Sequence, residues 1–111
     1  MAELSSVSQQ IWDMKYRLKD AAGQPVDKTI ADTWRRVAHA LAAPEADPSY
    51  WEQRFFEAME DFRLLPAGRI LSGAGTNREV TLFNCFVMGD IPDDMAGIFD
   101  GLKEAALTMQ Q

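Results

Sequence analysis

Apolar residues recur at spacings of three and four in three successive segments, and proline or glycine separates each segment from the next. That spacing places one apolar stripe along each of three amphipathic helices. Proline ends a helix because its ring restricts the preceding residue and its nitrogen has no proton to donate. Three such helices, each with a large inward-facing aromatic residue, predict a compact helical bundle. The predicted helices run from about Ser8 to Lys19, from Thr29 to the residue before Pro44, and from Asp47 to the residue before Pro66.

The same spacing assigns an inner face to each predicted helix. Thr29 and Asp32 have the spacing of a capping box at the start of the second helix. His39 falls opposite the buried face of that helix, so we expect it in solvent. The predicted inner positions are Ile11, Met14 and Leu18 in the first helix, widened by Trp12 and Tyr16; Ile30, Trp34, Val37 and Leu41 in the second; and Trp51, Phe55, Ala58, Met59 and Phe62 in the third, where Phe56 and Leu64 extend the apolar surface.

The pattern changes after Pro66, where Gly68, Gly73 and Gly75 fall within eight residues. Glycine accepts backbone angles that other residues resist, so this stretch predicts a bend. Residues 80–88 are rich in β-branched and aromatic side chains and are apolar on both faces, which predicts a strand covered on both sides. Because the chain offers no second convincing strand, we expect this one to pair with another chain or with a sheet that continues elsewhere.

A fourth predicted helix follows Asp93 and Asp94, which suit a helix start. It reaches Gln111 without a glycine, proline or basic residue to end it. We therefore expect the natural chain to continue. The apolar stripe of this helix consists of Met95, Ile98, Phe99, Leu102, Ala106 and Met109.

The charge and the cysteine content exclude several classes of protein. Seventeen acidic against eleven basic residues give a net charge of −6, which argues against nucleic-acid binding and against electrostatic attachment to a membrane. No apolar run approaches the roughly 20 residues of a membrane span. The N-terminus lacks the layout of a secretory signal, and Cys85, the single cysteine, cannot form an internal disulfide, so we expect a cytoplasmic protein. One histidine and one cysteine on separate elements predict no metal site.

Cys85 is the residue best suited to carry chemistry, and two interpretations stand. It is either a buried structural residue that behaves as a small hydrophobe, or a reactive thiol activated by a cation such as Arg69 or Arg78. The glycine stretch lacks the Gly-Lys-Ser/Thr ending of a phosphate loop and does not link a strand to a helix as a dinucleotide fingerprint does. Its backbone amides could still face a ligand.

Several stretches resemble the N-terminal part of the catalytic chain of the adenosylcobalamin-dependent (class II) ribonucleotide reductases. The resemblance implies a mainly α fold, with a helical N-terminal domain over residues 1–66. It also implies that residues 67–111 contribute the glycine-rich bend, first strand and first helix of an incomplete ten-stranded α/β barrel. The resembling stretches are Leu65–Thr76, Asn84–Val87 and Asp94–Phe99, supported upstream by Ile11–Arg17 and Asp32–Ala38.

The resemblance further implies radical reduction of ribonucleotides to deoxyribonucleotides with a pair of cysteines. Cys85 matches the first of the pair, Asn84 and Cys85 would contact the substrate, and Gly68 and Arg69 match a second substrate-contacting stretch. Many relatives carry a hydroxyl side chain in that second stretch, where this chain has Gly68-Arg69. The partner cysteine, the radical-bearing cysteine, the catalytic carboxylate and most of the cobalamin surface lie downstream in the family. The fragment alone is therefore expected to be inactive and to hold no adenosylcobalamin.

Two other interpretations stay open at this point. The chain could be a non-catalytic helical interaction module derived from such an enzyme, with the unpaired strand and last helix as its partner surface, and a homodimer would then form. It could also belong to the iron-dependent or another class of the same reductases. The sequence leaves the choice between a diphosphate and a triphosphate substrate open.

Overall fold

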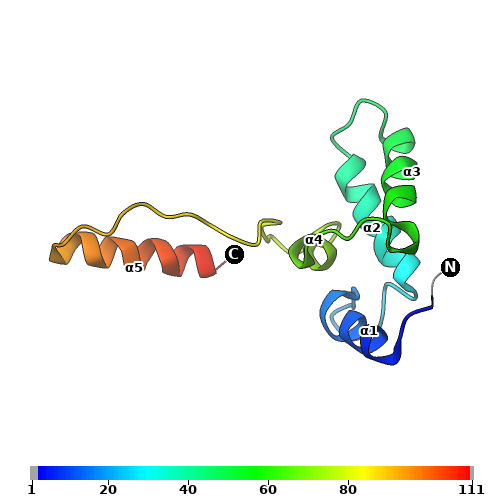
Figure 1. Ribbon diagram of the computed structural model, residues 1–111, viewed down its shortest axis with the longest axis horizontal. Coiled ribbons are helices and arrows are strands. Elements are labelled where there is room, and N and C mark those ends of the chain that lie inside the picture. The colour runs from blue at the N-terminus through cyan, green and yellow to red at the C-terminus, as the bar shows by residue number, and fades with distance from the viewer. Residues whose placement is uncertain (1–2, 111) are drawn as a thin grey trace.

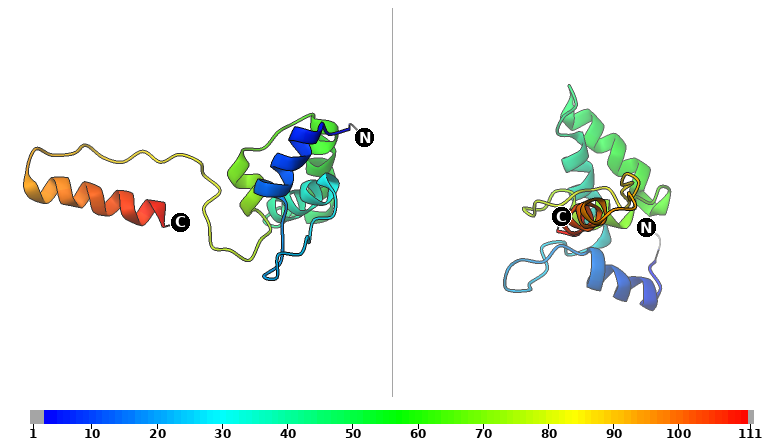
Figure 2. Two further views of the ribbon diagram at one scale, coloured as in Figure 1. Left: turned by 90° about the horizontal axis from the view of Figure 1, so that it is seen from below. Right: turned by 90° about the vertical axis from the view of Figure 1, so that its left-hand side faces the viewer.

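The computed structural model describes residues 3–110, and its regular elements are helices (Figure 1). A helical body extends from the N-terminus through α4, and an arm that ends in α5 projects from it (Figures 1 and 2). The mainly α prediction is confirmed. The α-helices are α1 (Ser6–Ile11), α2 (Ile30–Ala42), α3 (Pro48–Met59), α4 (Gly68–Gly73) and α5 (Met95–Met109), with a π-helical turn at Trp12–Tyr16 and a 3₁₀ turn at Glu60–Phe62.

Helix α2 forms as the sequence predicts. Thr29 and Asp32 make a reciprocal capping box, in which the Asp32 carboxylate accepts from the Thr29 amide at 3.0 Å. The helix ends at Ala42, before Pro44. Its buried face consists of Thr33, Trp34, Val37, Ala38 and Ala42.

Helix α3 starts where predicted, and Met59 and Phe55 of its predicted inner face lie in or against the core. The Asp47 carboxylate accepts from the Tyr50 amide at 3.3 Å and caps the helix. Phe56 and Met59 are buried, whereas the predicted inner residues Trp51 and Ala58 are exposed. Trp51 and Phe56 are both large and aromatic, and the apolar spacing alone does not show which of the two faces the core.

The end of α3 explains part of this difference. Asp61 and Phe62 adopt positive φ angles of 56° and 61°, which break the helix after Met59. The chain turns back, and the ring of Phe62 meets Trp34 edge-on at a centroid distance of 5.2 Å. Phe62 thus packs against α2 from a turn instead of extending the α3 stripe.

The core lies where α2, α3 and the end of α4 meet. Its buried residues are Trp34, Val37, Ala38, Phe56, Met59 and Ala74. The first predicted helix, expected to reach Lys19, ends instead with a π turn at Tyr16, because the backbone of Arg17 is extended. Trp12 is buried, while the predicted inner residues Ile11 and Met14 are exposed.

A buried ion pair connects the N-terminal segment to α2. An Nη2 of Arg36 lies 3.0 Å from an Oδ2 of Asp27, and their side chains are 9% and 4% exposed. The same carboxylate oxygen accepts from the Thr33 hydroxyl at 2.7 Å and from the Leu18 amide at 3.1 Å. The Thr33 hydroxyl oxygen in turn accepts from the indole of Trp12 at 2.9 Å. Asp27 therefore connects the segment at Leu18 to helix α2, and through Thr33 to the π turn at Trp12.

Arg36 extends this network to α4. Its guanidinium donates to the carbonyl oxygens of Tyr16 at 3.2 Å, Leu71 at 2.8 Å and Ala74 at 2.5 Å. Carbonyls at the end of a helix lack partners within the helix, and the guanidinium satisfies two of them. Within residues 3–110, no buried side-chain polar atom is left without a hydrogen bond.

The glycine-rich stretch is not a simple bend. Gly68–Gly73 forms helix α4, and Arg36 donates to the Leu71 carbonyl in its last turn. The turn comes afterwards at Gly75, whose φ of +74° favours glycine. A Cβ at Gly75 would also lie only 2.7 Å from the Arg36 Cγ.

The segment predicted as a strand, residues 80–88, is extended and forms no ladder with any other described residue. A strand needs a neighbouring strand to satisfy its backbone groups, and the described chain supplies none here. Phe83 and Val87 are accordingly 73% and 99% exposed instead of covered on both faces.

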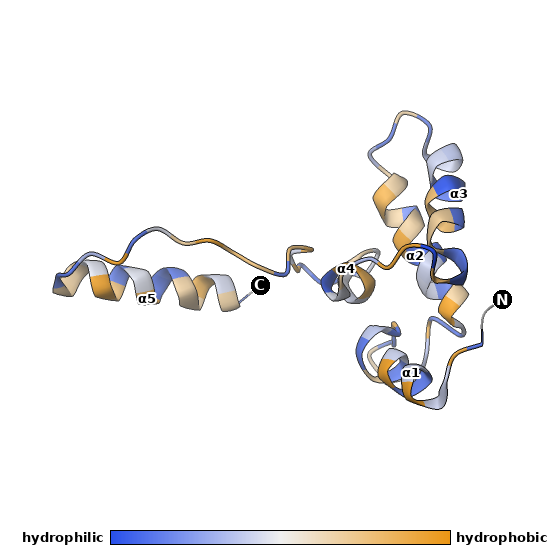
Figure 3. Cartoon of the chain, in the orientation of Figure 1, coloured by the Kyte–Doolittle hydropathy of each residue, from blue (hydrophilic) through white to orange (hydrophobic). Residues whose placement is uncertain are grey.

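Helix α5 begins as predicted, with the Asp94 carboxylate accepting from the Gly97 amide at 2.7 Å. None of its residues is buried. Figure 3 shows apolar residues on α5 and along the extended segment that leads to it. The exposed large apolar side chains of α5 are Met95, Ile98, Phe99, Leu102, Leu107 and Met109.

Removing either member of the buried ion pair should destabilise the helical body severely. We expect Asp27→Ala or Arg36→Ala to lower the free energy of unfolding by about 3–5 kcal/mol, because each leaves a buried charge without its partner. Urea unfolding followed by circular dichroism measures the change. Arg54→Ala is the matched control: its ion pair with Glu57 is exposed, and its loss should cost less than about 1 kcal/mol. Equal effects of the two substitutions would contradict the central role of the buried pair.

Candidate functional site

Cys85 lies exposed on the extended segment. Its neighbour Asn84 is exposed too. Within residues 3–110, the Cys85 side chain is therefore not buried, as the structural interpretation of this cysteine would require. An exposed thiol can meet reductants, oxidants and a partner thiol from solution or from another part of a protein.

The second pair of predicted site residues lies on α4. Arg69 is exposed, and Gly68 is half-buried beside Tyr16, where an added Cβ would come within 3.2 Å of the ring. Arg78, one of the cations considered for thiol activation, donates to the Ser72 carbonyl at 2.6 Å and is held at α4 instead. The helical body thus carries one half of the predicted site, and the extended segment carries the other half.

The base of the extended segment is fastened to α4. Leu82 packs against the core cluster, and Val80 and Leu82 both approach Gly73. The Thr81 hydroxyl accepts from the Phe83 amide at 3.1 Å and shapes the next turn of the chain. Cys85 follows only three residues after Leu82.

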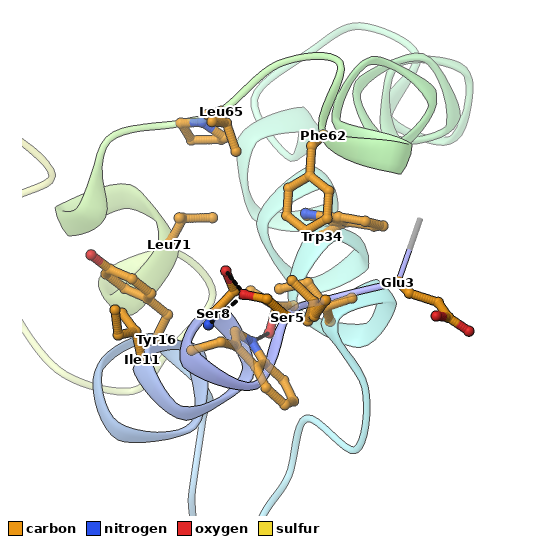
Figure 4. A pocket seen from close by; sticks show the side chains of 14 residues that line it. Glu3, Ser5, Ser8, Ile11, Tyr16, Trp34, Phe62, Leu65 and Leu71 are labelled. Atoms are coloured by element: carbon orange, nitrogen blue, oxygen red, sulfur yellow. Dashed lines mark hydrogen bonds between the residues drawn. The ribbon is translucent and has the colours of Figure 1, made fainter. Parts of the chain in front are cut away.

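The body also contains an apolar pocket of about 420 Å³ that the sequence analysis did not predict (Figure 4). Tyr16, Trp34, Phe62 and Leu71 contribute to its walls from four different elements. None of Gly68, Arg69, Asn84 and Cys85 lines it. The residues that form it are far apart in sequence, so no local pattern could have revealed it.

This pocket offers a ligand mainly apolar contact area and few reactive groups. The Thr33 hydroxyl in its wall is already engaged with Asp27 and Trp12. Ser5 and Ser8 bond to each other at 3.0 Å at its N-terminal edge, as Figure 4 shows. The pocket is therefore suited to an apolar group and is not arranged as a catalytic centre.

The pKa of the Asp13 carboxyl is lowered by its neighbour Arg17. A hydrogen bond from Arg17 at 2.8 Å holds the pKa of Asp13 below its ordinary value, burial opposes this, and attraction to Lys19 adds to the lowering. Since the folded pKa is lowered, this pairing stabilises the fold above the ordinary pKa and is lost as the pH falls through the lowered one. Asp13 pairs with Arg17 only four residues away, and a carboxylate with a lowered pKa is too weak a base for proton transfer near neutral pH.

Two kinds of feature are absent from residues 3–110. Three or more His, Cys, Asp or Glu side chains do not gather anywhere in this range in a way that could hold a metal ion. No helix in the same range combines the length and the apolar character needed to cross a bilayer.

An all-α body followed by an exposed thiol segment defines the class of structure, and comparison with known proteins gives the family. Residues 2–79 match the family described as "Ribonucleotide reductase, all-alpha domain". The chain therefore belongs to the ribonucleotide reductase all-alpha domain family. Gly68 and Arg69 lie within the matched residues, and Asn84 and Cys85 lie beyond them.

Individual relatives agree with this family. The chain is 33% identical over 93 residues to the ribonucleoside-diphosphate reductase subunit alpha of Helicobacter pylori strain ATCC 700392 / 26695, covering 84% of this chain and 11% of the relative. It is 32% identical over 74 residues to the subunit of the same name from Chlamydia muridarum, covering 67% of this chain and 7% of the relative. The chain thus spans about a tenth of the length of these curated relatives. No solved structure matches it significantly.

The exposure of Cys85 predicts its reactivity in the native chain. We expect a thiol reagent such as Ellman's reagent to modify one thiol per chain at nearly the rate seen in denaturant. A matched control places cysteine at the fully buried Ala38 in a Cys85→Ser background, where native modification should be strongly slowed. Protection of Cys85 comparable to that of the Ala38→Cys thiol would contradict the exposed position.

Proposed function

We propose that this chain forms the N-terminal part of the catalytic chain of a ribonucleotide reductase, with Cys85 as one of its two reducing thiols. The observation that carries this proposal is the order of the parts. A helical body of the reductase family is followed, shortly after its last matched residue, by an exposed thiol. The names of the relatives specify a ribonucleoside diphosphate, and we adopt this as the substrate class.

The proposed reaction balances with two thiols and not with one. The C2′–OH bond of the ribonucleotide breaks, a C2′–H bond forms, and the hydroxyl leaves as water. Two thiols each give up one proton and one electron and join as a disulfide. Cys85 supplies one of the two, and the second thiol, the radical-bearing cysteine and the catalytic carboxylate belong to the remainder of the protein. This chain alone is therefore inactive in our proposal.

The other predicted site residues receive binding roles in this proposal. Asn84 contacts the substrate beside Cys85, through its amide side chain or its backbone. Arg69 is exposed and cationic, which suits contact with a phosphate, while Gly68 offers its backbone. In our proposal, the pair Asn84 and Cys85 and the pair Gly68 and Arg69 come together when the rest of the protein covers the extended segment. A thiol that cycles through a disulfide must be reduced again, so we also propose a cytoplasmic location.

For the whole protein we propose adenosylcobalamin as the cofactor, from the resemblance of the stretches around Gly68 and Cys85 to the cobalamin-dependent class. When bound, this group supplies the radical that starts the reaction. The described residues form no site that fits adenosylcobalamin. The pocket of about 420 Å³ has the size of a small-ligand site, and His39 does not line it but pairs with Glu52 at 2.8 Å on the exposed side of α2. We therefore place the cofactor on the remainder of the protein.

The cofactor assignment is tested with the protein that continues through the catalytic domain. Turnover of a ribonucleoside diphosphate with adenosylcobalamin as the sole added cofactor is the expected result. A strict requirement for a second, iron-containing subunit would overturn the cobalamin assignment and favour the iron-dependent class.

The redox role of Cys85 is tested in the same continuous protein. We expect Cys85→Ser to abolish multiple turnover with a dithiol reductant, because a hydroxyl cannot form the disulfide. Deoxyribonucleotide formation per enzyme chain is the measurement. Asp90→Asn, an exposed change in the same arm, serves as the control and should retain activity. Unchanged turnover in the serine variant would defeat the assigned role.

The exposed apolar side of α5 favours a second candidate function. Met95, Phe99 and Leu102 are 72%, 60% and 62% exposed, which is typical of a surface that meets a partner. As an interaction module, the chain would form a specific homodimer through the extended segment and α5. Analytical ultracentrifugation separates the two functions. A defined dimer that Leu102→Glu dissociates would support the module, and open-ended association would support the reductase.

A further inference from the structure

Gly73, the last residue of α4, makes an unusually close approach to the segment that carries Cys85. A Cβ built on Gly73 would lie 2.9 Å from the Cγ2 of Val80 and 3.3 Å from the Cδ2 of Leu82. Gly73 itself is buried, and both partners are half-buried. The extended segment therefore starts in a contact that leaves no room for a side chain at this position.

The backbone at Gly73 does not explain why glycine stands there. Its φ is not among the positive values of the chain, in contrast to Gly23 and Gly75, and it closes a regular helix. Alanine would fit such backbone angles and is a better helix former than glycine. What excludes a side chain at Gly73 is the space that Val80 and Leu82 occupy.

The surface on which Val80 and Leu82 rest is itself fixed. Arg36 holds the carbonyls of Leu71 and Ala74, one on each side of Gly73 in sequence, and Asp27 holds Arg36 from the other side. Val80 is β-branched, so its methyl groups cannot swing away cheaply from an added Cβ. An added methyl group at Gly73 would displace the segment, because the helix behind it is anchored.

We infer that Gly73 is a positioning residue for Cys85: its missing side chain lets Val80 and Leu82 seat on α4, and this contact fixes where the thiol-bearing segment leaves the body. The inference rests on the proposed function for its catalytic consequence only. The structural part concerns this chain alone. Cys85 is three residues from Leu82, so a shift at the contact is carried directly to the thiol.

The structural part is tested with a nitroxide label on Cys85, the single cysteine of the chain. In the native chain the label should broaden the amide NMR signals of α4. In Gly73→Ala, the broadening of the α4 amide signals should be clearly weaker and distributed over more residues, while the helical content is kept. Gly101→Ala is the matched control, because an added Cβ there meets Ile91 at an ordinary 3.7 Å. Unchanged broadening in Gly73→Ala would overturn the inference.

A compensating variant separates positioning from general damage. Val80→Ala removes the methyl group that lies 2.9 Å from the added Cβ. The double variant Gly73→Ala/Val80→Ala should therefore recover most of the native broadening that Gly73→Ala loses. Failure of this rescue, with α4 still folded, would also overturn the inference.

The catalytic consequence is measured in the continuous protein. Gly73→Ala should lower kcat about 10- to 100-fold, since small misplacements of reacting groups cost rates of that order, and the double variant should recover part of the loss. If the label moves but kcat is unchanged while Cys85→Ser is inactive, the positioning role is wrong. If Cys85→Ser stays active, the proposed function fails, and the label experiment alone still decides whether Gly73 seats the segment.

Discussion

The ion pair between Asp27 and Arg36 holds the helical body together. Taking two charges out of water is expensive, and the cost is offset only when both groups are fully hydrogen-bonded. Here the carboxylate receives donors from the N-terminal segment and from α2, and the guanidinium reaches carbonyls of the N-terminal segment and α4. The apolar core between α2 and α3 contributes burial, but this pair determines how the first and the last parts of the body are attached to it.

The candidate site depends indirectly on the ion pair between Asp27 and Arg36. Arg36 fixes α4, α4 seats Val80 and Leu82, and the segment beyond them presents Cys85 to solvent. The sequence could single out Cys85 and the stretch around it, because cysteine chemistry and family motifs are local. It could not predict whether the thiol is covered, since burial depends on elements that pack from elsewhere.

Local rules predicted much of the fold. The capping box at Thr29 and the start of α3 at Asp47 were predicted correctly because the interactions that set them lie within one helical turn. The inner face of α3 was predicted only in part: Met59 is buried as expected, but Phe56 and not Trp51 faces the core, and tertiary contact selects between these two aromatic residues. The segment 80–88 has the composition of a strand, but a strand exists only with a neighbour to pair with. Nor does any local pattern distinguish a buried arginine in an amphipathic helix from a solvated one.

The long reach of Arg36 has a consequence for the order of folding. Helices α2 and α3 are joined by a short loop, so their contacts form at a small cost in chain entropy. The bonds from Arg36 to Leu71 and Ala74 instead close loops of 35 and 38 residues. We expect the α2–α3 hairpin to form early and α4 to dock late, because distant contacts slow folding. The segment with Cys85 would then find its place last, when the rest of the body is already built.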